Sequence, residues 1–198
     1  MNKYFKKFKI SFNSPVVLTF VFICFVATLL GILTRDYLTG LLFSTYRASF
    51  LNPLTYLRLI THVFGHSGFS HFIGNASYIL LIGPMLEEKY GSKILVEIII
   101  ITAVFTGIIN MIFSSNTSLC GASGVVFAFI IIASFTGFQN GEIPLTFILV
   151  VVIFIGQQLV DAIAARDNVS QLTHIVGGLI GAIIGYVLNC KKSPLHTH

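Results

Sequence analysis

Charged residues are scarce in this sequence. Only 10% of its 198 residues are Asp, Glu, Lys or Arg, whereas 55% are hydrophobic, and the mean hydropathy is +0.90. A water-soluble domain carries roughly 25% charged residues. This shortage excludes a surface that faces water on most sides. Because a backbone in lipid must satisfy its hydrogen bonds within helices or a closed barrel, and the apolar runs here are unbroken, we expect an all-α integral membrane protein.

Cysteines are few, and internal repeats are absent. Cys24, Cys120 and Cys190 are odd in number and widely spaced, which predicts neither a disulfide framework nor a zinc site. The lack of a convincing repeat disfavours a transporter built from duplicated halves.

The net charge of +5 comes from lysines gathered at the two ends of the chain. The N-terminus carries Lys3, Lys6, Lys7 and Lys9, and the C-terminus carries Lys191 and Lys192. Such clusters on a hydrophobic chain are typical of membrane-topology signals. We therefore expect no nucleic-acid partner.

Six segments are apolar enough to be membrane spans, with boundaries uncertain by a few residues. They are 15–33, 70–87, 93–113, 123–138, 143–160 and 171–189. An even number of spans puts both termini on one side, and the lysines place that side in the cytoplasm. The sequence thus predicts a basic cytoplasmic N-terminus at 1–14, a six-span domain at 15–190, a cytoplasmic tail at 191–198, and a long first outer loop over 35–69.

Polar side chains gather at one depth of this predicted bundle. The second, fourth and sixth spans all run from outside to inside, and they begin with His71 and Asn75, with Ser123, and with His174. His71 and Asn75 are four residues apart and share a helix face. The fourth span is short, so Ser123 is expected below the outer surface, where polar backbone is tolerated only beside protein or a water-filled cavity. We predict a recessed, wet pocket with Ser123 at its floor.

A serine hydroxyl needs a base to become a nucleophile, and His174 is the candidate. Phe127 follows Ser123 by one helical turn and is expected to support the imidazole ring. The sixth span carries Gly177 and Gly181 in a stripe of small residues, and Gly124 offers a matching surface on the fourth span. Close approach of these two spans is what a hydrogen bond between Ser123 and His174 requires.

Acyl transfer also needs donors for the developing oxyanion. The N–H of Ser123 begins a helix, and His71 and Asn75 offer side-chain donors. Gly121 lies two residues before Ser123, where it lets backbone approach the hydroxyl. With no convincing third acid, the sequence predicts a Ser–His dyad that needs no metal or cofactor.

Other interpretations remain open from the residues alone. Two glycines around a serine, taken in isolation, favour helix packing. A His-rich set, His62, His66, His71 and His174, is also compatible with a membrane metal or haem protein. A non-catalytic binder of membrane segments is a further alternative. We expect structural roles for His62 and His66, a loop-anchor or headgroup role for Arg58, and we assign no role to Cys120.

Four motifs between Asn52 and Gly185 resemble, in order and spacing, those of the rhomboid intramembrane serine proteases. Residues 58–75 read R-L-I-T-H-V-F-G-H-S-G-F-S-H-F-I-G-N and resemble the family's first-loop and second-span signature. Gly83 and Glu87 match a G-x-x-x-E motif, residues 120–124 match G-x-S-G, and residues 173–181 are similar to A-H-x-x-G-x-x-x-G.

The resemblance implies a six-span rhomboid-like bundle in which Ser123 is the nucleophile and His174 the general base. It implies that His71 and Asn75 help form the oxyanion hole. It also implies cleavage of transmembrane protein substrates within the lipid bilayer, by a minimal bacterial type of enzyme in the plasma membrane, with the oligomeric state left open.

The sequence departs from the family pattern at three positions. Leu57 precedes Arg58 where the family usually has Trp, Thr173 replaces the usual Ala, and Phe127 stands where Tyr is common. None of these changes removes a catalytic group, so we expect an active protease.

Overall fold

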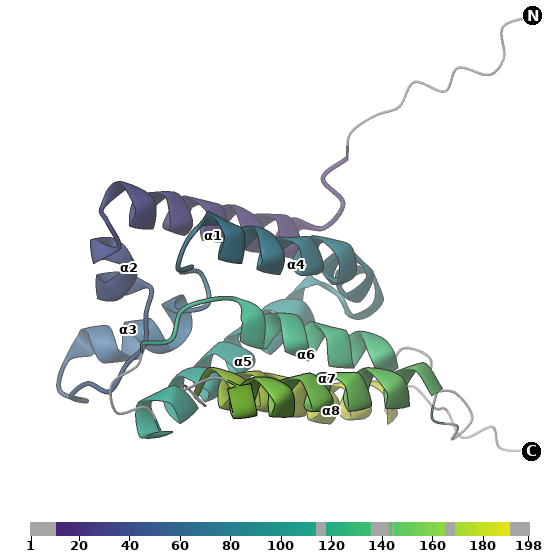
Figure 1. Cartoon of the computed structure of the whole chain (residues 1–198). Coiled ribbons are helices and arrows are strands. Elements are labelled where there is room, and N and C mark those ends of the chain that lie inside the picture. Colours follow the sequence, from purple (N-terminus) through teal and green to yellow (C-terminus); the bar gives the residue numbers. More distant parts are fainter. Residues whose placement is uncertain (1–10, 114–117, 136–142, 144, 165–168, 191–198) are drawn as a thin grey trace, which may run out of the picture.

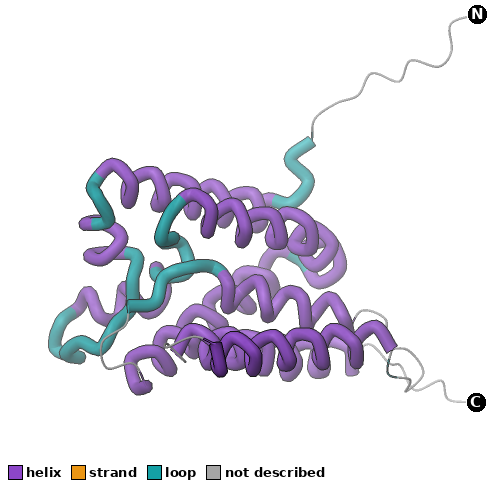
Figure 2. Tube along the Cα trace, viewed as in Figure 1, coloured by secondary structure: helices purple, strands orange, loops and turns teal. Residues whose placement is uncertain are grey.

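The computed structural model describes residues 11–113, 118–135, 143, 145–164 and 169–190. These residues form eight α-helices and no named strand (Figures 1 and 2). The helices are α1 Pro15–Leu33, α2 Tyr37–Leu42, α3 Pro53–Thr61, α4 Phe69–Tyr90, α5 Ser92–Phe113, α6 Ser123–Ser134, α7 Leu145–Ala164 and α8 Val169–Cys190.

All six predicted spans coincide with helices, each beginning within two residues of the predicted start. The first span has the predicted bounds, and α6 begins at Ser123 as predicted, while the predicted end of that span at 138 lies outside the described residues. Four described helices, α1, α4, α5 and most of α8, are long and apolar enough to cross a membrane, and α6 is a shorter apolar helix. The predicted terminal segments 1–14 and 191–198 fall almost entirely outside the described residues.

Large apolar side chains point outward along these helices. Leu81 on α4, Ile153 on α7 and Ile183 on α8 are each more than 60% exposed. Such surfaces are expensive in water and favourable in hydrocarbon. The protein is therefore an integral membrane protein.

Glu87 joins the C-terminal end of α4 to the N-terminal end of α1. Its carboxylate oxygens accept hydrogen bonds from the backbone N–H groups of Val16 and Val17 at 3.0 and 3.1 Å, and from the Ser92 hydroxyl at 2.7 Å. The first N–H groups of a helix have no intrahelical partner, so this buried carboxylate caps α1. One turn earlier Gly83 leaves space for Val17, because a Cβ on Gly83 would lie 2.7 Å from its methyl group.

Helices α6 and α8 pack closely along their glycines. A Cβ added to Gly177 would collide with the backbone of Gly124, and one added to Gly181 would lie 2.6 Å from the carbonyl oxygen of Ala128. The close approach predicted from the small residues is therefore present. It brings the first turns of α6 and α8 together at the end of the bundle where α4 begins (Figure 1).

The loop between α1 and α4 folds back over that same end. Arg58 on α3 is buried, donates from Nε to the carbonyl of Leu41 at 2.8 Å, and lies 4.6 Å from the ring centroid of Tyr46. It is the loop anchor that the sequence suggested. Thr45 then forms an isolated antiparallel bridge with Leu119, and the Asn110 amide of α5 donates to the Thr45 carbonyl at 2.9 Å. The loop thereby fixes the segment that leads into Ser123.

Candidate active site

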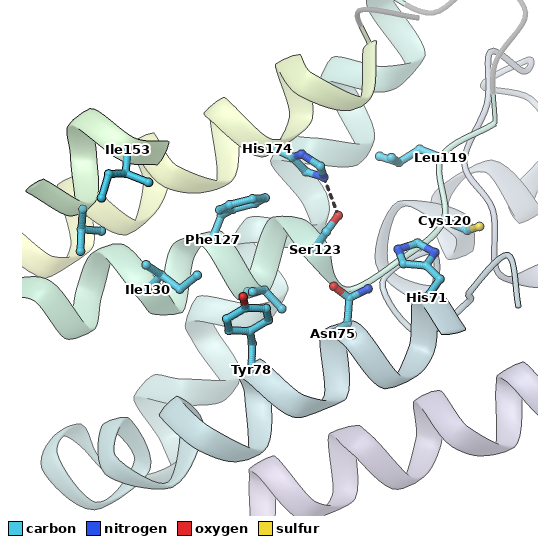
Figure 3. A pocket seen from close by; sticks show the side chains of 13 residues that line it. His71, Asn75, Tyr78, Leu119, Cys120, Ser123, Phe127, Ile130, Ile153 and His174 are labelled. Carbon is cyan, nitrogen blue, oxygen red and sulfur yellow. Dashed lines mark hydrogen bonds between the residues drawn. The ribbon is translucent and has the colours of Figure 1, made fainter. Parts of the chain in front are cut away.

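Ser123 and His174 are hydrogen-bonded, although 51 residues separate them in sequence. The distance from Ser123 Oγ to His174 Nε2 is 2.8 Å. We assign the hydroxyl as the donor, which places the imidazole proton on Nδ1. The ring of Phe127 packs against the imidazole with a centroid distance of 4.7 Å (Figure 3). All three residues thus have the arrangement expected from the sequence, and both helices meet there because of the glycine packing.

The backbone before Ser123 adopts a conformation that needs glycine. Gly121 has φ +134°, and a Cβ there would lie 2.8 Å from Cε1 and 3.0 Å from Nε2 of His71. The Gly121 N–H donates to the backbone carbonyl of His62 at 2.9 Å. Because Ser123 is the first residue of α6, its own N–H has no intrahelical acceptor.

His71 and Asn75 reach toward Ser123 from the first turns of α4 (Figure 3). The Ser67 hydroxyl lies 3.1 Å from His71 Nδ1. If it donates to that nitrogen, the ring proton lies on Nε2, the atom on the Gly121 side. Asn75 is 8% exposed, and its Nδ2 has no hydrogen-bond partner among the described residues. A buried amide donor without an acceptor is costly, and an anionic ligand would satisfy it.

A cavity of about 690 Å³ contains these groups. Ser123, His174, His71 and Asn75 lie together on its wall, and its surface is mainly apolar. The structure adds six side chains that the sequence interpretation did not identify: Tyr78 of α4, Leu119 before α6, Val126 and Ile130 of α6, and Val150 and Ile153 of α7. Tyr78 could have been predicted from the sequence, because it lies seven residues after His71 and therefore on the same helix face. The residues of α7 carried no comparable signal. Of the polar stretch 114–118 that precedes this wall, the structure describes only Ser118.

His62 and His66 lie outside this cavity. His62 is buried, donates from Nδ1 to the carbonyl of Arg58 at 3.1 Å, and has Nε2 3.3 Å from the Thr106 hydroxyl. Burial lowers the pKa of His62 to about 4, so the ring is neutral at neutral pH. Both histidines are buried, in the structural surroundings that the sequence suggested.

Cys120 lies on the cavity wall three residues before Ser123, with its sulfur pointing away from the Ser123 hydroxyl (Figure 3). Burial raises the pKa of its thiol, an effect that a hydrogen bond with Ser44 opposes. A thiol needs a low pKa to be a good nucleophile. Ser123, with its base, is therefore the nucleophile candidate in this cavity.

The His-rich alternative finds no support in the geometry. Among the described residues, no group of three or more His, Cys, Asp or Glu side chains is placed to hold a metal ion. His62 is occupied by Arg58 and Thr106, whereas His174 is paired with Ser123.

The cavity thus brings together a serine at a helix N-terminus, a histidine at 2.8 Å and nearby amide and imidazole groups, inside a membrane helix bundle. The family model for the Rhomboid domain matches residues 53–190, which include all of these groups. The chain belongs to the rhomboid family.

Curated relatives carry the same family name. The chain is 31% identical over 140 residues to Rhomboid-related protein 1 of Caenorhabditis elegans, covering 66% of this chain and 39% of that protein. It is 24% identical over 133 residues to Rhomboid protease GlpG of Haemophilus influenzae, covering 66% of this chain and 68% of that protein. It is also 24% identical over 179 residues to Rhomboid protease GlpG of Yersinia pestis, covering 87% of this chain and 62% of that protein. The chain thus spans less than two thirds of two of these three relatives.

Proposed function

We propose that this protein is an intramembrane serine endopeptidase that cleaves transmembrane segments of other membrane proteins with a Ser123–His174 dyad. The observation that carries the proposal is the 2.8 Å hydrogen bond between Ser123 Oγ and His174 Nε2 inside a cavity of a membrane protein. Membership of a family that includes proteins named rhomboid proteases supports it.

The chemistry follows from the positions of these groups. As Ser123 Oγ attacks the scissile carbonyl carbon, His174 Nε2 takes the hydroxyl proton. The carbonyl oxygen becomes an oxyanion, for which the Ser123 N–H, His71 and Asn75 are the donors. His174 then returns the proton to the leaving amine, which leaves an acyl-enzyme on Ser123. Water, deprotonated by His174, hydrolyses this ester and restores the serine.

The substrate must expose a peptide carbonyl at this site. A helix hides its carbonyl groups in hydrogen bonds, so the cleaved segment has to unwind locally. We therefore infer that preferred substrates carry small or helix-breaking residues near the cut. No cofactor is part of this mechanism.

We propose the membrane topology that the positions of the lysines indicate. The domain at 15–190 crosses the membrane six times, both termini are cytoplasmic, and the dyad opens toward the outer side of a bacterial plasma membrane. In support, Lys89 lies in the last turn of α4 and Lys93 in the first turn of α5, at the end of the bundle where Glu87 caps α1. His71, Ser123 and His174 lie at the start of α4, α6 and α8, near the opposite end (Figure 1).

The proposal is tested by cleavage of a single-span reporter with the purified protein in liposomes. Ser123→Ala is expected to abolish cleavage without lowering the thermal midpoint, because it removes only the nucleophile. Ser118→Ala is the matched control, since Ser118 is an exposed serine in the same connection. Wild-type protein, but not Ser123→Ala, should react with a fluorophosphonate.

Cleavage by Ser123→Ala at the wild-type rate would contradict the proposal. A non-catalytic binder of membrane segments, the second candidate, would instead bind the reporter in both forms and show neither cleavage nor labelling.

A further inference from the structure

A second cavity lies at the end of the bundle opposite to the dyad, and the proposed function does not use it. Its volume is about 570 Å³, within the range of roughly 300–1,000 Å³ that is usual for ligand sites. Its walls come from the residues before α1, the last two turns of α4 and the start of α5 (Figure 1). These three helices are long enough to cross a membrane, so their ends lie near a membrane surface. We call this space the polar cavity, because Asn13, Ser14, Glu87, Glu88 and Ser92 line it.

Ser14 contributes a buried hydroxyl without a partner to the polar cavity. The residue is 2% exposed and occupies the N-cap position of α1. An N-cap serine ordinarily accepts a hydrogen bond from the second or third N–H group of its helix. Here Glu87 accepts from both of these groups, on Val16 and Val17, and the Ser14 hydroxyl makes no hydrogen bond within the described residues. A buried hydroxyl without a partner is costly, so Ser14 points to a ligand in this cavity.

The charge on the wall of the polar cavity is negative. Glu87 and Glu88 line it, and no described Lys or Arg does. The Glu87 carboxylate is taken up by α1, whereas Glu88 is exposed in the last turn of α4 and forms no ion pair with another described residue. The C-terminal end of a helix carries a partial negative charge, which adds to the charge of Glu88. A cationic group is therefore the complement of this wall.

The same cavity also offers donors for an anionic group. α5 begins at Ser92 on its wall. The first N–H groups of a helix have no intrahelical acceptor and favour an anion such as phosphate. The Ser92 hydroxyl already donates to Glu87 at 2.7 Å, so the backbone N–H groups are the donors that remain. A ligand that carries both a cation and a phosphate fits this arrangement.

An apolar groove adjoins the polar cavity at Pro15, which lines both spaces. The groove has a volume of about 420 Å³ and lies between α1 and α5, with an almost wholly apolar surface. Phe20 and Ile99 are buried in it, while Ile23 and Ile100 are partly exposed along its edges. From Pro15 to Ile23 it follows α1 for about 12 Å, at 1.5 Å per residue. A groove that leads from a membrane surface into the hydrocarbon core fits an acyl chain.

We propose that the polar cavity and the apolar groove together bind one phospholipid with a primary-ammonium headgroup, a phosphatidylethanolamine. The ammonium donates to Glu88 and to the Ser14 hydroxyl, the phosphate accepts from the first N–H groups of α5, and one acyl chain lies in the groove. Hydrocarbon gains little by leaving other lipid for a groove, so the headgroup carries the selectivity. A primary ammonium has N–H donors, whereas the quaternary ammonium of phosphatidylcholine has none. The site is independent of the proposed function of Ser123 and His174.

Fluorescence quenching tests the lipid site, because the sequence contains no tryptophan. Val96→Trp places a single indole on the groove, and Val187→Trp is the matched control near the end of α8, outside the groove. Each variant of the full chain is reconstituted in phosphatidylcholine with a small fraction of lipid whose acyl chains are brominated. For Val96→Trp we expect an apparent affinity about fivefold higher for brominated phosphatidylethanolamine than for brominated phosphatidylcholine, as for one ion pair near the surface. For Val187→Trp the two lipids should agree within about twofold.

Substitutions of the headgroup contacts are made in the Val96→Trp chain. Glu88→Gln removes the charge and keeps the shape, so the preference for phosphatidylethanolamine should fall to within about twofold. Glu97→Gln is the matched control, since Glu97 is an exposed glutamate of α5 outside both spaces, and it should leave the preference unchanged. Ser14→Ala should lower the affinity for phosphatidylethanolamine about threefold. It should leave the thermal midpoint in phosphatidylcholine alone unchanged, because this hydroxyl caps no helix.

Three results would overturn the proposal. Equal quenching of Val96→Trp by the two brominated lipids would show that the headgroup is not recognised. A preference that persists in Glu88→Gln would show that this carboxylate does not bind the ammonium. Stronger quenching by brominated phosphatidylglycerol, an anionic lipid, would show that lysines select the lipid instead. Should Val96→Trp fail to fold, by its thermal midpoint, the measurement is made with Ile100→Trp on the same groove.

Discussion

At the scale of single residues, the site depends on one glycine as much as on its reacting groups. Gly121 has a backbone conformation that L side chains rarely adopt, and His71 occupies the space where its Cβ would lie. Its N–H is held by the His62 carbonyl, so the peptide before Ser123 has little freedom to move. His71 can therefore lie against the peptide that precedes Ser123 only because residue 121 has no side chain.

Gly121→Ala should reduce kcat by at least about 100-fold, comparable to the loss of one oxyanion-hole donor, because the new methyl group displaces His71. Gly74→Ala is the matched control. Gly74 lines the same cavity, but a Cβ there meets nothing within 4 Å. Reporter cleavage by both variants, with thermal midpoints, measures the difference. Equal activity of the two variants would show that the backbone at 121 can relax.

The sequence was most informative about residues with a chemical role. Ser123, His174, His71 and Asn75 were predictable because polar side chains at membrane depth are costly and therefore stand out. The Ser67–His71 contact and the α7 side chains on the cavity wall were not predictable, since they depend on side-chain placement in three dimensions. The catalytic roles of these four polar residues stay predictions until the variants are measured.

At the scale of elements, the contact between α6 and α8 sets the geometry of the dyad. Ser123 begins α6 and His174 lies in the second turn of α8, so their separation is fixed by how closely the two backbones pack. Gly124 and Gly177 form the contact nearest to the dyad. In lipid no hydrophobic effect drives helices together. Small residues allow close van der Waals packing, which stabilises the helix contact instead.

Gly177→Ala should push α8 away from α6, because its Cβ collides with the backbone of Gly124, which cannot rotate aside. We expect a loss of roughly 1–3 kcal/mol in stability, as for other overpacked sites, and about a tenfold or greater loss in kcat. Gly156→Ala is the control, since that α7 glycine has open space around it. Thermal midpoints in detergent and reporter cleavage are the measurements. An unchanged midpoint and rate for Gly177→Ala would refute the dependence on this contact.

The long apolar elements were predictable, while the short ones were not. Unbroken apolar runs gave the starts of six helices to within two residues. α2 and α3 lie inside the segment expected to be a long loop, because helices of 6 and 9 residues span too few turns to be identified from their periodicity. α4 extends to Tyr90, beyond the predicted end at 87, and ends before Gly91, which has φ +88°.

At the scale of the whole molecule, Lys89 and Lys93 lie at the end of the bundle opposite to the Ser123–His174 pair. Glu87 ties the end of α4 to the beginning of α1, and Lys89 and Lys93 lie in the adjoining residues. The dyad and the anchored first loop occupy the other end (Figure 1). If lysines mark the cytoplasmic side, the catalytic cavity opens near the outer side.

Reporter fusions test this orientation directly in bacterial cells. A fluorescent protein that matures only in the cytoplasm should fluoresce when fused to either terminus of the full chain, and alkaline phosphatase, active only outside, should be inactive there. A truncated fusion after Phe50, in the first outer loop, should give the reverse pattern, because a single crossing separates it from the N-terminal lysines. Opposite signals from the two termini would exclude an even number of spans. Phosphatase activity at both termini would show the opposite orientation, with the dyad near the cytoplasmic side. Substrates would then have to be cut on that side.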